Sequence, residues 1–168
     1  MKTKSKPRSK AGAQTQHQEH DHGQCGHDHG PCGHDHGLMC EIQVRKFRQE
    51  DYKELRATWK AGDIKLDDTD SAKFIKDNLK RFAHSYRIFI AEAQMVDAAK
   101  NAPVGEPRIA GGVITTFDGH RAHVYHLAVH PDFRSVGLGK ALLDTCEKQA
   151  RMWGARHLRL SARKDASR

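Results

Sequence analysis

The sequence predicts an α/β domain in which a mixed β-sheet is flanked by helices. Two periodicities support this prediction. Some stretches alternate apolar and polar residues, as half-buried strands do, and others place apolar residues three or four positions apart, as amphipathic helices do. The predicted order is strand, helix, helix, strand, strand, strand, helix, strand. Because the last unit is a strand, a helix and a strand, we expect its two strands to be parallel and joined by a right-handed crossover.

The first three elements follow from local patterns near the start of this domain. Residues 41–47 alternate apolar and polar side chains and predict a strand. Residues 51–60 place their apolar side chains on one helical face. A second helix is expected over residues 72–82, and either Asp70 or Ser71 can cap its N-terminus with a side-chain oxygen.

The next elements are three strands and their connections. Residues 86–93 are rich in β-forming side chains and predict a strand, whereas residues 96–107 are polar, contain two prolines and indicate a loop. Further strands are expected at 108–117 and 122–130. The Asp118-Gly119 pair between them is a strong hairpin signal.

The last predicted unit begins where the period changes from two to about 3.6. Apolar residues between positions 138 and 153 fall on one helical face, and Gly154 is placed to end this helix. Cys146 lies on the apolar face, so we interpret it as a core residue. Residues 158–162 alternate again and predict the final strand.

The chain divides into two parts of different composition. Residues 1–40 hold seven of the 13 histidines and three of the four cysteines, but no Phe, Tyr or Trp. We therefore expect a disordered His/Cys/Gly-rich tail over residues 1–38 and one folded domain over 41–168, which is long enough to bury a core. Neither an apolar run of membrane-spanning length nor a secretory signal is present, so we expect a cytoplasmic protein.

The tail contains a repeat with a period of seven residues that begins at His20. Each repeat supplies two imidazoles, and the first two repeats add a thiol three residues later. Imidazole and thiolate are ligands that suit Zn²⁺ and Ni²⁺, and the tract resembles the His-rich extensions of nickel- and zinc-handling proteins. The candidate metal ligands are His20, His22, Cys25, His27, His29, Cys32, His34 and His36.

The positive charge of the chain belongs mainly to the folded domain. Five basic and four acidic side chains in residues 1–40 leave the domain with +7 of the total formal charge of +8. A basic domain suits nucleic acid, an anionic membrane or a phosphorylated small ligand. Composition alone does not choose among these, and we see no recognition helix or aromatic platform that would favour nucleic acid.

A glycine-rich turn selects the phosphorylated ligand. Residues 134–139 have the pattern R-x-x-G-x-G between the strand at 122–130 and the helix that follows. Glycines at a helix start allow main-chain N–H groups to converge on an anion, and the helix dipole favours negative charge there. Arg134 and Lys140 add positive charge, and Ser135 adds a hydroxyl donor. The turn is neither a dinucleotide fingerprint nor a Walker loop, because the required glycines and the G-K-[ST] ending are absent.

The strand ending L-A-V-H-P-D-F-R, followed by R-x-x-G-x-G and an amphipathic helix, resembles the GCN5-related N-acetyltransferase (GNAT) superfamily. The resemblance spans about residues 41–163 and implies a GNAT-like fold with acetyl-CoA as cosubstrate. It implies that backbone groups of Leu127 and Val129 pair with the pantetheine arm and that the turn holds the pyrophosphate. The implied residues of the turn are Arg134, Ser135, Val136, Gly137, Leu138, Gly139 and Lys140.

The resemblance also implies direct attack of an amine on the thioester, without an acyl-enzyme, so Cys146 is not expected to be a nucleophile. Direct attack needs a proton acceptor, and the family often places one on the strand at 122–130. His123 and Tyr125 are the candidates, and this stretch also resembles the arylalkylamine N-acetyltransferase branch, which has histidines at both positions. By alternation we expect His123 and Tyr125 to share a face with Leu127, with His126 and His130 on the other.

The resemblance predicts an N-acetyltransferase whose acceptor is an amine of a small molecule or a protein. Family members continue after the last strand with a helix and further strand, whereas this sequence ends at Arg168. We therefore expect a fold that is incomplete at its C-terminal end. The alternative is a metal-binding or metal-responsive protein whose GNAT-like domain is a non-catalytic CoA-binding module. We expect no membrane or nucleic-acid partner and leave a homodimer open.

Overall fold

The computed structural model describes residues 38–161. The predicted tail and its metal ligands lie outside this range. Five strands form one sheet in the order β1-β2-β3-β4-β5. The strands are β1 (Leu38–Lys46), β2 (Tyr86–Asp97), β3 (Ala102–Phe117), β4 (Ala122–Val129) and β5 (Leu158–Leu160). The helices are α1 (Tyr52–Ala61), α2 (Ala72–Arg81) and α3 (Leu138–Met152), and short 3₁₀ turns are η1 (Gln49–Asp51), η2 (Asp68–Asp70) and η3 (Pro131–Phe133).

The sheet is mixed, as the sequence predicts. Strands β1 to β4 pair antiparallel with their neighbours, and β5 pairs parallel with β4. The parallel pair is connected through α3, which confirms the predicted unit of strand, helix and strand. The observed order of strands and helices is also the predicted one.

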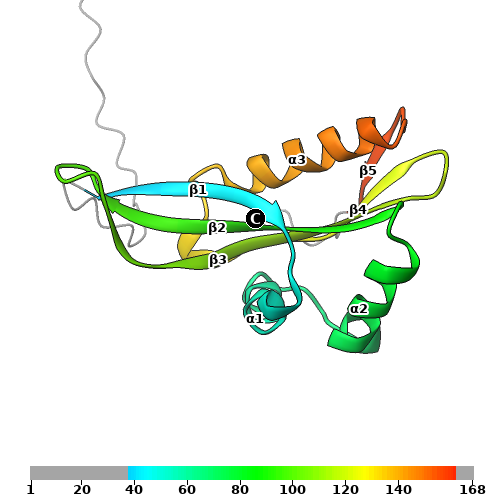
Figure 1. The fold of residues 1–168 in the computed structure, drawn as a ribbon, viewed down its shortest axis with the longest axis horizontal. Coiled ribbons are helices and arrows are strands. Elements are labelled where there is room, and N and C mark those ends of the chain that lie inside the picture. The colour runs from blue at the N-terminus through cyan, green and yellow to red at the C-terminus, as the bar shows by residue number, and fades with distance from the viewer. Residues whose placement is uncertain (1–37, 162–168) are drawn as a thin grey trace, which may run out of the picture. The chain divides into compact units, whose positions relative to one another are not determined.

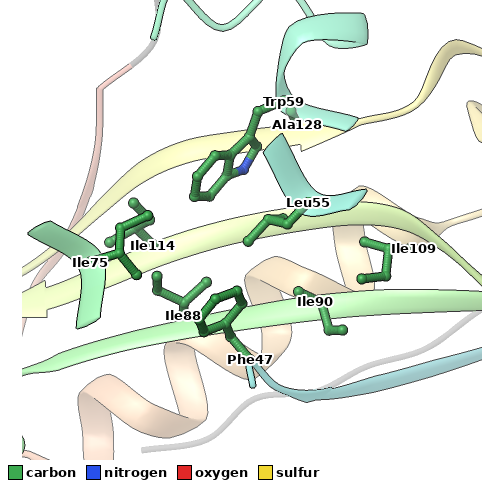
Figure 2. Close-up of a cluster of buried hydrophobic side chains, with 9 residues drawn as sticks. All are labelled: Phe47, Leu55, Trp59, Ile75, Ile88, Ile90, Ile109, Ile114 and Ala128. Atoms are coloured by element: carbon green, nitrogen blue, oxygen red, sulfur yellow. The ribbon is translucent and has the colours of Figure 1, made fainter. Parts of the chain in front are cut away.

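Helices cover both faces of the sheet: α1 and α2 lie on one side and α3 on the other (Figure 1). Strand β2 shows how the sequence divides between these faces. Ile88 and Ile90 belong to the buried cluster under α1 and α2, which Figure 2 shows, whereas Phe89 and Ala91 belong to the cluster under α3. This period of two is the physical origin of the alternating pattern in the sequence.

Two adjacent glycines in β3 allow both helix layers to approach the sheet closely. A Cβ atom on Gly112 would overlap Leu55 Cδ1 of α1 and would lie 3.2 Å from Trp59 Nε1. A Cβ atom on Gly111 would lie 3.1 Å from Leu142 Cδ1 of α3. Any side chain here would push a helix outward, so the two cores on opposite faces depend on this pair.

Helix α1 is also attached to β3 by two polar contacts at one residue. Glu54 Oε1 accepts a hydrogen bond from Ile109 N–H at 2.8 Å, and Thr58 Oγ1 donates one to the Ile109 carbonyl at 2.8 Å. The pairing of β2 with β3 shifts register next to Ile109. The α1 side chains therefore satisfy backbone groups of Ile109 at this irregular point of the ladder.

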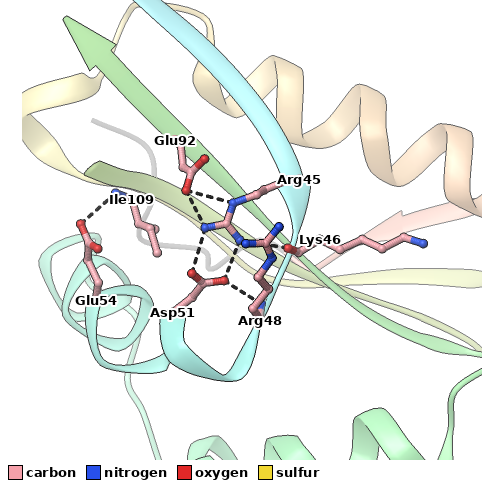
Figure 3. A network of polar contacts seen from close by, with 7 residues as sticks. All are labelled: Arg45, Lys46, Arg48, Asp51, Glu54, Glu92 and Ile109. Carbon is pink, nitrogen blue, oxygen red and sulfur yellow. Dashed lines mark hydrogen bonds and ion pairs between the residues drawn. The ribbon is translucent and has the colours of Figure 1, made fainter. Parts of the chain in front are cut away.

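A second polar network joins the β1–η1 connection to β2 (Figure 3). The Arg45 guanidinium donates to both carboxylate oxygens of Asp51, at 2.8 and 2.9 Å, and also to Glu92 Oε1. The Arg48 N–H donates to the same Asp51 carboxylate at 2.6 Å. Burial alone would raise the pKa of Asp51, but the bonds from Arg45 and Arg48 outweigh it and lower this pKa.

The helix ends resolve one alternative that the sequence left open. Ser71 caps α2, because its hydroxyl accepts a hydrogen bond from Phe74 N–H at 3.3 Å. Asp70 instead turns inward and is buried. At the other end of the domain, Gly154 has a φ of +79° just beyond α3, as predicted for a residue that ends a helix.

The prediction of a loop over residues 96–107 is wrong. Strand β2 continues to Asp97 and β3 begins at Ala102, so the two strands form a long hairpin. The first part of β3 pairs only with β2, since β4 reaches no further than Gly111. Prolines are tolerated on such an unpaired edge and at bulges, and Pro107 lies in a stretch where the register shifts.

We expect Gly112→Ala to destabilise the domain by about 1–3 kcal/mol, because the added methyl overlaps Leu55. Urea denaturation followed by circular dichroism measures this. Combined with Leu55→Ala, the substitution should cost less than the sum of the two single changes, because the smaller side chain leaves room for the methyl. Gly139→Ala is the matched control, since its Cβ would meet only Val129 Cγ2, at 3.8 Å. Additive costs for the Gly112 and Leu55 pair would contradict the steric explanation.

We expect Asp51→Asn to destabilise the domain by about 3 kcal/mol at pH 7, because it breaks a buried ion pair with Arg45. The folded-state pKa of Asp51 is lowered from 3.8, so the ion pair stabilises above that pH, and its contribution is lost as the pH falls through the folded pKa. Urea denaturation from pH 7 to pH 3 should therefore show the difference from wild type shrinking. The exposed Asp77→Asn is the control, and a difference that stays constant with pH would argue against this account.

Candidate functional site

The glycine-rich turn connects η3 to the N-terminus of α3. Ser135 and Gly137 both have left-handed backbone conformations, with φ of +67° and +88°, and Gly137 is the N-cap of the helix. The first backbone bond into the helix is donated by Ala141 N–H to the Gly137 carbonyl. The amides of residues 135–140 therefore have no backbone acceptor among the described residues, and a helix N-terminus of this kind can bind an anion.

The side-chain charges at this turn differ from the sequence expectation in one respect. Arg134 is exposed and forms no ion pair with a carboxylate of residues 38–161. Lys140, however, lies 2.6 Å from Asp144 Oδ2, one turn further along α3. A hydrogen bond from the ammonium group to Asp144 raises the pKa of Lys140. The positive charge that Lys140 adds at the turn is thus partly offset by a carboxylate that the sequence analysis did not consider.

Among residues 38–161, no strand covers one edge of the C-terminal half of β4, which we call its open edge. Strand β5 pairs only with residues 122–124 of β4, and β3 occupies the other edge. His130 N–H donates to the Ala110 carbonyl of β3 at 2.7 Å. Since backbone groups alternate along a strand, those of Val129 point toward the open edge, and those of Leu127 do the same two residues earlier.

The open edge and the turn lie beside each other. A Cβ atom on Gly139, in the first turn of α3, would contact Val129 Cγ2 at 3.8 Å. Leu127 and Val129 both pack against the buried cluster that includes Leu138 of the same helix. The structure therefore brings together the two groups of residues that the sequence analysis named for a coenzyme, residues 127–129 and 134–140.

Strand β4 contains a bulge, and one sequence prediction is wrong because of it. Ala128 pairs with Gly112 and Tyr125 with Ile114, so β4 has one residue more than β3 across this interval. His126 lies in this bulge and has a left-handed backbone conformation, with a φ of +51°. The alternation of side chains is reset here.

The reset changes which side chains share a face. Tyr125 lies opposite Ile114, which belongs to the cluster under α1 and α2, and His126 contacts Trp59 of the same cluster. Leu127 packs on the α3 side. His123, Tyr125 and His126 therefore lie on the α1/α2 face, whereas the prediction placed His123 and Tyr125 with Leu127 and put His126 opposite. His130 lies beyond the strand and is the N-cap of η3.

His123 is held by the hairpin turn before it. Its Nε2 atom lies 3.1 Å from Asp118 Oδ2, and its ring stacks on Tyr125 with the centroids 6.1 Å apart. Bonds from the Arg121 and His120 N–H groups, and then from His123, hold the pKa of Asp118 below its usual value. The two residues that the sequence named as catalytic candidates are thus neighbours at the start of β4, and Tyr125 is 40% exposed.

Sequence reasoning missed a second histidine–carboxylate pair under the bulge. His126 Nε2 lies 2.8 Å from Asp70 Oδ1, although the angle does not meet hydrogen-bond geometry. The Trp59 ring meets the His126 ring edge-on at a centroid distance of 5.2 Å. Asp70 was considered only as a helix cap, and the spacing of the sequence carries no signal that joins it to a strand more than fifty residues later.

Cys146 is a core residue, as predicted. Its side chain has no solvent exposure, and burial raises the pKa of the thiol to about 12. A thiol in this state supplies almost no thiolate near neutral pH. The structure thus gives no support to a covalent intermediate at this cysteine.

Surface hollows lie away from this site. One of about 280 Å³ lies on the outer side of α1 beside Lys53 and Arg56, and another of about 250 Å³ lies between the end of α3 and His157. Neither includes the turn or the open half of β4. Within residues 38–161, no helix is long and apolar enough to span a membrane, and no group of three or more His, Cys, Asp or Glu side chains could hold a metal ion.

Comparison with known protein families gives the class of this protein. The family described as "Acetyltransferase (GNAT) family" matches residues 52–168, well over half of the chain. The chain therefore belongs to the GNAT family, whose members are acetyl-CoA-dependent N-acetyltransferases, and the predicted membership of the GNAT superfamily is confirmed. The mixed sheet flanked by helices is the GNAT fold.

Solved structures of other acetyltransferases share this fold. Glucosamine-6-phosphate N-acetyltransferase from Arabidopsis thaliana superposes with a TM-score of 0.55 at 12% identity, covering 74% of this chain and 84% of the other. AAC(6')-Iy, solved with the bisubstrate analog CoA-S-monomethyl-acetylneamine, gives 0.54 at 14% identity, covering 76% and 83%. Ribosomal-protein-alanine N-acetyltransferase from Brucella melitensis gives 0.52 at 22% identity, covering 74% and 82%.

Proposed function

We propose that this chain transfers the acetyl group of acetyl-CoA to an amine by direct attack. One observation carries the proposal: in a chain of the GNAT family, the unpaired amides of residues 135–140 lie beside the open edge of β4. We assign the pyrophosphate to the turn that runs from Arg134 to Lys140. We assign the pantetheine arm to the edge at Leu127 and Val129, where it would pair with backbone groups as an added strand does.

The acceptor is proposed to be a primary amine of a small molecule or a protein. Glucosamine-6-phosphate N-acetyltransferase and ribosomal-protein-alanine N-acetyltransferase, both of this fold, are named for one acceptor of each kind. Attack on the thioester requires a neutral amine, because the lone pair forms the new bond. His123 and Tyr125 remain candidates for assisting the loss of the proton, and both rings lie on the α1/α2 face of β4.

We expect Gly137→Glu to weaken acetyl-CoA binding by at least about tenfold. A Cβ atom at this position meets no neighbouring atom, but the φ of +88° is strained for glutamate, and the carboxylate adds negative charge where phosphates would bind. Isothermal titration of the full chain with acetyl-CoA measures the loss.

The matched control is Gly105→Glu, in the β2–β3 hairpin. Gly105 also has a positive φ, +75°, and also has open space around its Cβ position, so the substitution adds the same strain and charge away from the turn. We expect its acetyl-CoA affinity to match that of wild type. If the two variants bind acetyl-CoA with equal affinity, the assignment of the pyrophosphate to this turn is wrong.

We propose as a second function that residues 1–38 bind Zn²⁺ or Ni²⁺, on the observation of the His-Asp-His repeats. Titration of the full chain with either metal should give tight binding, and replacing the eight candidate ligands between His20 and His36 with alanine should abolish it.

If the tail is accessory to acetyl transfer, EDTA should leave the rate of acetyl transfer unchanged. If no amine is acetylated while metal binds tightly, the alternative of a metal-responsive protein with a non-catalytic CoA module replaces the first proposal.

A further inference from the structure

We propose that His126 accepts the proton of the acceptor amine and that Asp70 positions its ring. This inference rests on the proposed acetyl transfer and names a residue for it that neither the sequence pattern nor the family resemblance indicates. It depends on three features: the bulge that places the histidine, the buried carboxylate that contacts its Nε2 atom, and the second ring nitrogen, Nδ1, which has no polar contact within residues 38–161.

The bulge places His126 next to the edge that we assign to the thioester arm. His126 directly precedes Leu127, whose backbone faces the open edge, while the His126 ring lies on the opposite, α1/α2 face. In a regular strand Tyr125 would share the face of Leu127, and His126 alone would lie on the opposite face. The left-handed conformation of His126 instead gathers three polar rings on the face that the coenzyme edge does not use.

Asp70 is built to orient this ring. The residue is only 4% exposed, and its two carboxylate oxygens have different partners. Oδ2 accepts a hydrogen bond from Asp67 N–H at 2.9 Å, which fixes the carboxylate, and Oδ1 lies 2.8 Å from His126 Nε2. The Asp70 carbonyl in turn accepts a hydrogen bond from the Tyr52 hydroxyl at 2.9 Å. The buried carboxylate thus meets two groups, the Asp67 amide through Oδ2 and the His126 ring through Oδ1.

The contact assigns the tautomer of His126. Because a carboxylate oxygen lies 2.8 Å from Nε2, we place the proton of the neutral ring on Nε2 and the lone pair on Nδ1, although the angle of this contact does not meet hydrogen-bond geometry. The side chain is 25% exposed although Nε2 itself is buried, so the exposed part of the ring lies away from Asp70. No residue among those described contacts Nδ1 with a polar group. In this arrangement Nδ1 of His126 is the proton acceptor, and the Asp70 carboxylate holds the ring on its other side.

The groups around this ring come from several elements. Asp70 belongs to η2, and Asp67 is the residue just before η2. On α1, the Tyr52 hydroxyl contacts the Asp70 carbonyl, and the Trp59 ring packs against the His126 ring. From β2, Tyr86 faces the same carboxylate: burial and then the charge of Asp70 raise the pKa of Tyr86 to about 12. His123 and Tyr125 precede it on β4. The nearest charged groups are thus the carboxylates of Asp70 and Asp67.

His123 is less well placed for the same step. Its carboxylate partner, Asp118, is 51% exposed in the hairpin turn, and its pairing with Arg159 places it where β5 still covers the edge of β4. At a rise of about 3.3 Å per residue, its Cα lies roughly 13 Å along the strand from that of Leu127. His126 adjoins Leu127 directly.

The ammonium form of the acceptor gives one proton to Nδ1 of His126, and the freed lone pair forms the N–C bond to the thioester carbonyl carbon. The C–S bond breaks, and sulfur leaves with the electron pair. The proton then lost by nitrogen ends on the CoA thiolate, and His126 returns its proton to solvent, so the products are the amide, the free thiol and one proton.

The test uses His126→Asn in the full chain, because asparagine tolerates a positive φ and cannot act as the base. Release of CoA thiol is followed with spermidine, 2-phenylethylamine and a peptide with a free N-terminal alanine as acceptors. We expect kcat to fall about 100-fold while KM for acetyl-CoA stays unchanged. The acid limb of the pH profile of kcat/KM should flatten in this variant. His84→Gln, on an exposed loop, is the control and should behave as wild type.

A second readout does not depend on turnover. Long-range ¹H–¹⁵N correlation spectra of the histidine rings should show His126 with its proton on Nε2, and Asp70→Asn should abolish this preference and lower kcat without changing KM for acetyl-CoA. A proton on Nδ1 in wild type would overturn the positioning role of Asp70. If His126→Asn remains fully active, or if His123→Gln alone flattens the acid limb, the role of His126 is overturned while the proposed function stands. A wild-type chain that acetylates none of the amines overturns both.

Discussion

The close approach of two helices to adjacent glycines in β3 is the constraint on which the rest of this structure depends. Gly111 admits Leu142 of α3 on one face, and Gly112 admits Leu55 and Trp59 of α1 on the other. Both helices therefore lie near the same point of the sheet, where β3 pairs with the bulged part of β4. The hydrogen bonds from α1 to Ile109 hold this packing in one register. Because protein interiors are close-packed, a single methyl at either glycine would disturb both the core and the strand that carries the site.

Because of the bulge in β4, the two faces of this strand carry different kinds of side chain. Before the bulge, the polar rings of His123 and Tyr125 lie on the α1/α2 face; after it, Leu127 and Val129 anchor the strand against α3. One strand thus offers backbone groups at an open edge and ionisable side chains on the face away from α3. The glycine-rich turn follows within ten residues, at the start of the same helix that packs on Leu127. This arrangement would let the coenzyme proposed for the open edge and the acceptor proposed for the α1/α2 face approach β4 from different directions.

Local patterns predicted most of the fold because its elements are short and amphipathic. The strands, the three helices and the parallel crossover each left a period of two or 3.6 in the sequence, and the turn at 134–139 carried a glycine spacing with a physical meaning. Two features had no such signal. The β2–β3 hairpin contains Pro103 and Pro107, which indicate a loop unless it is known that this part of β3 has a free edge. The bulge at His126 is set by pairing with β3, so strict alternation gave the wrong face for Leu127 relative to Tyr125.

The strain at the bulge bears on how the site is held together. A residue other than glycine at a φ of +51° costs on the order of 1–3 kcal/mol, and such a cost persists only where the surroundings fix the conformation. Here Trp59 packs against the ring edge and Asp70 meets Nε2, so α1 and η2 both fix the position of the histidine. The same Trp59 lies against Gly112. The conformation of His126 is therefore tied to the packing of α1 on the sheet, and a substitution that displaces α1 should alter the ring before it unfolds the domain.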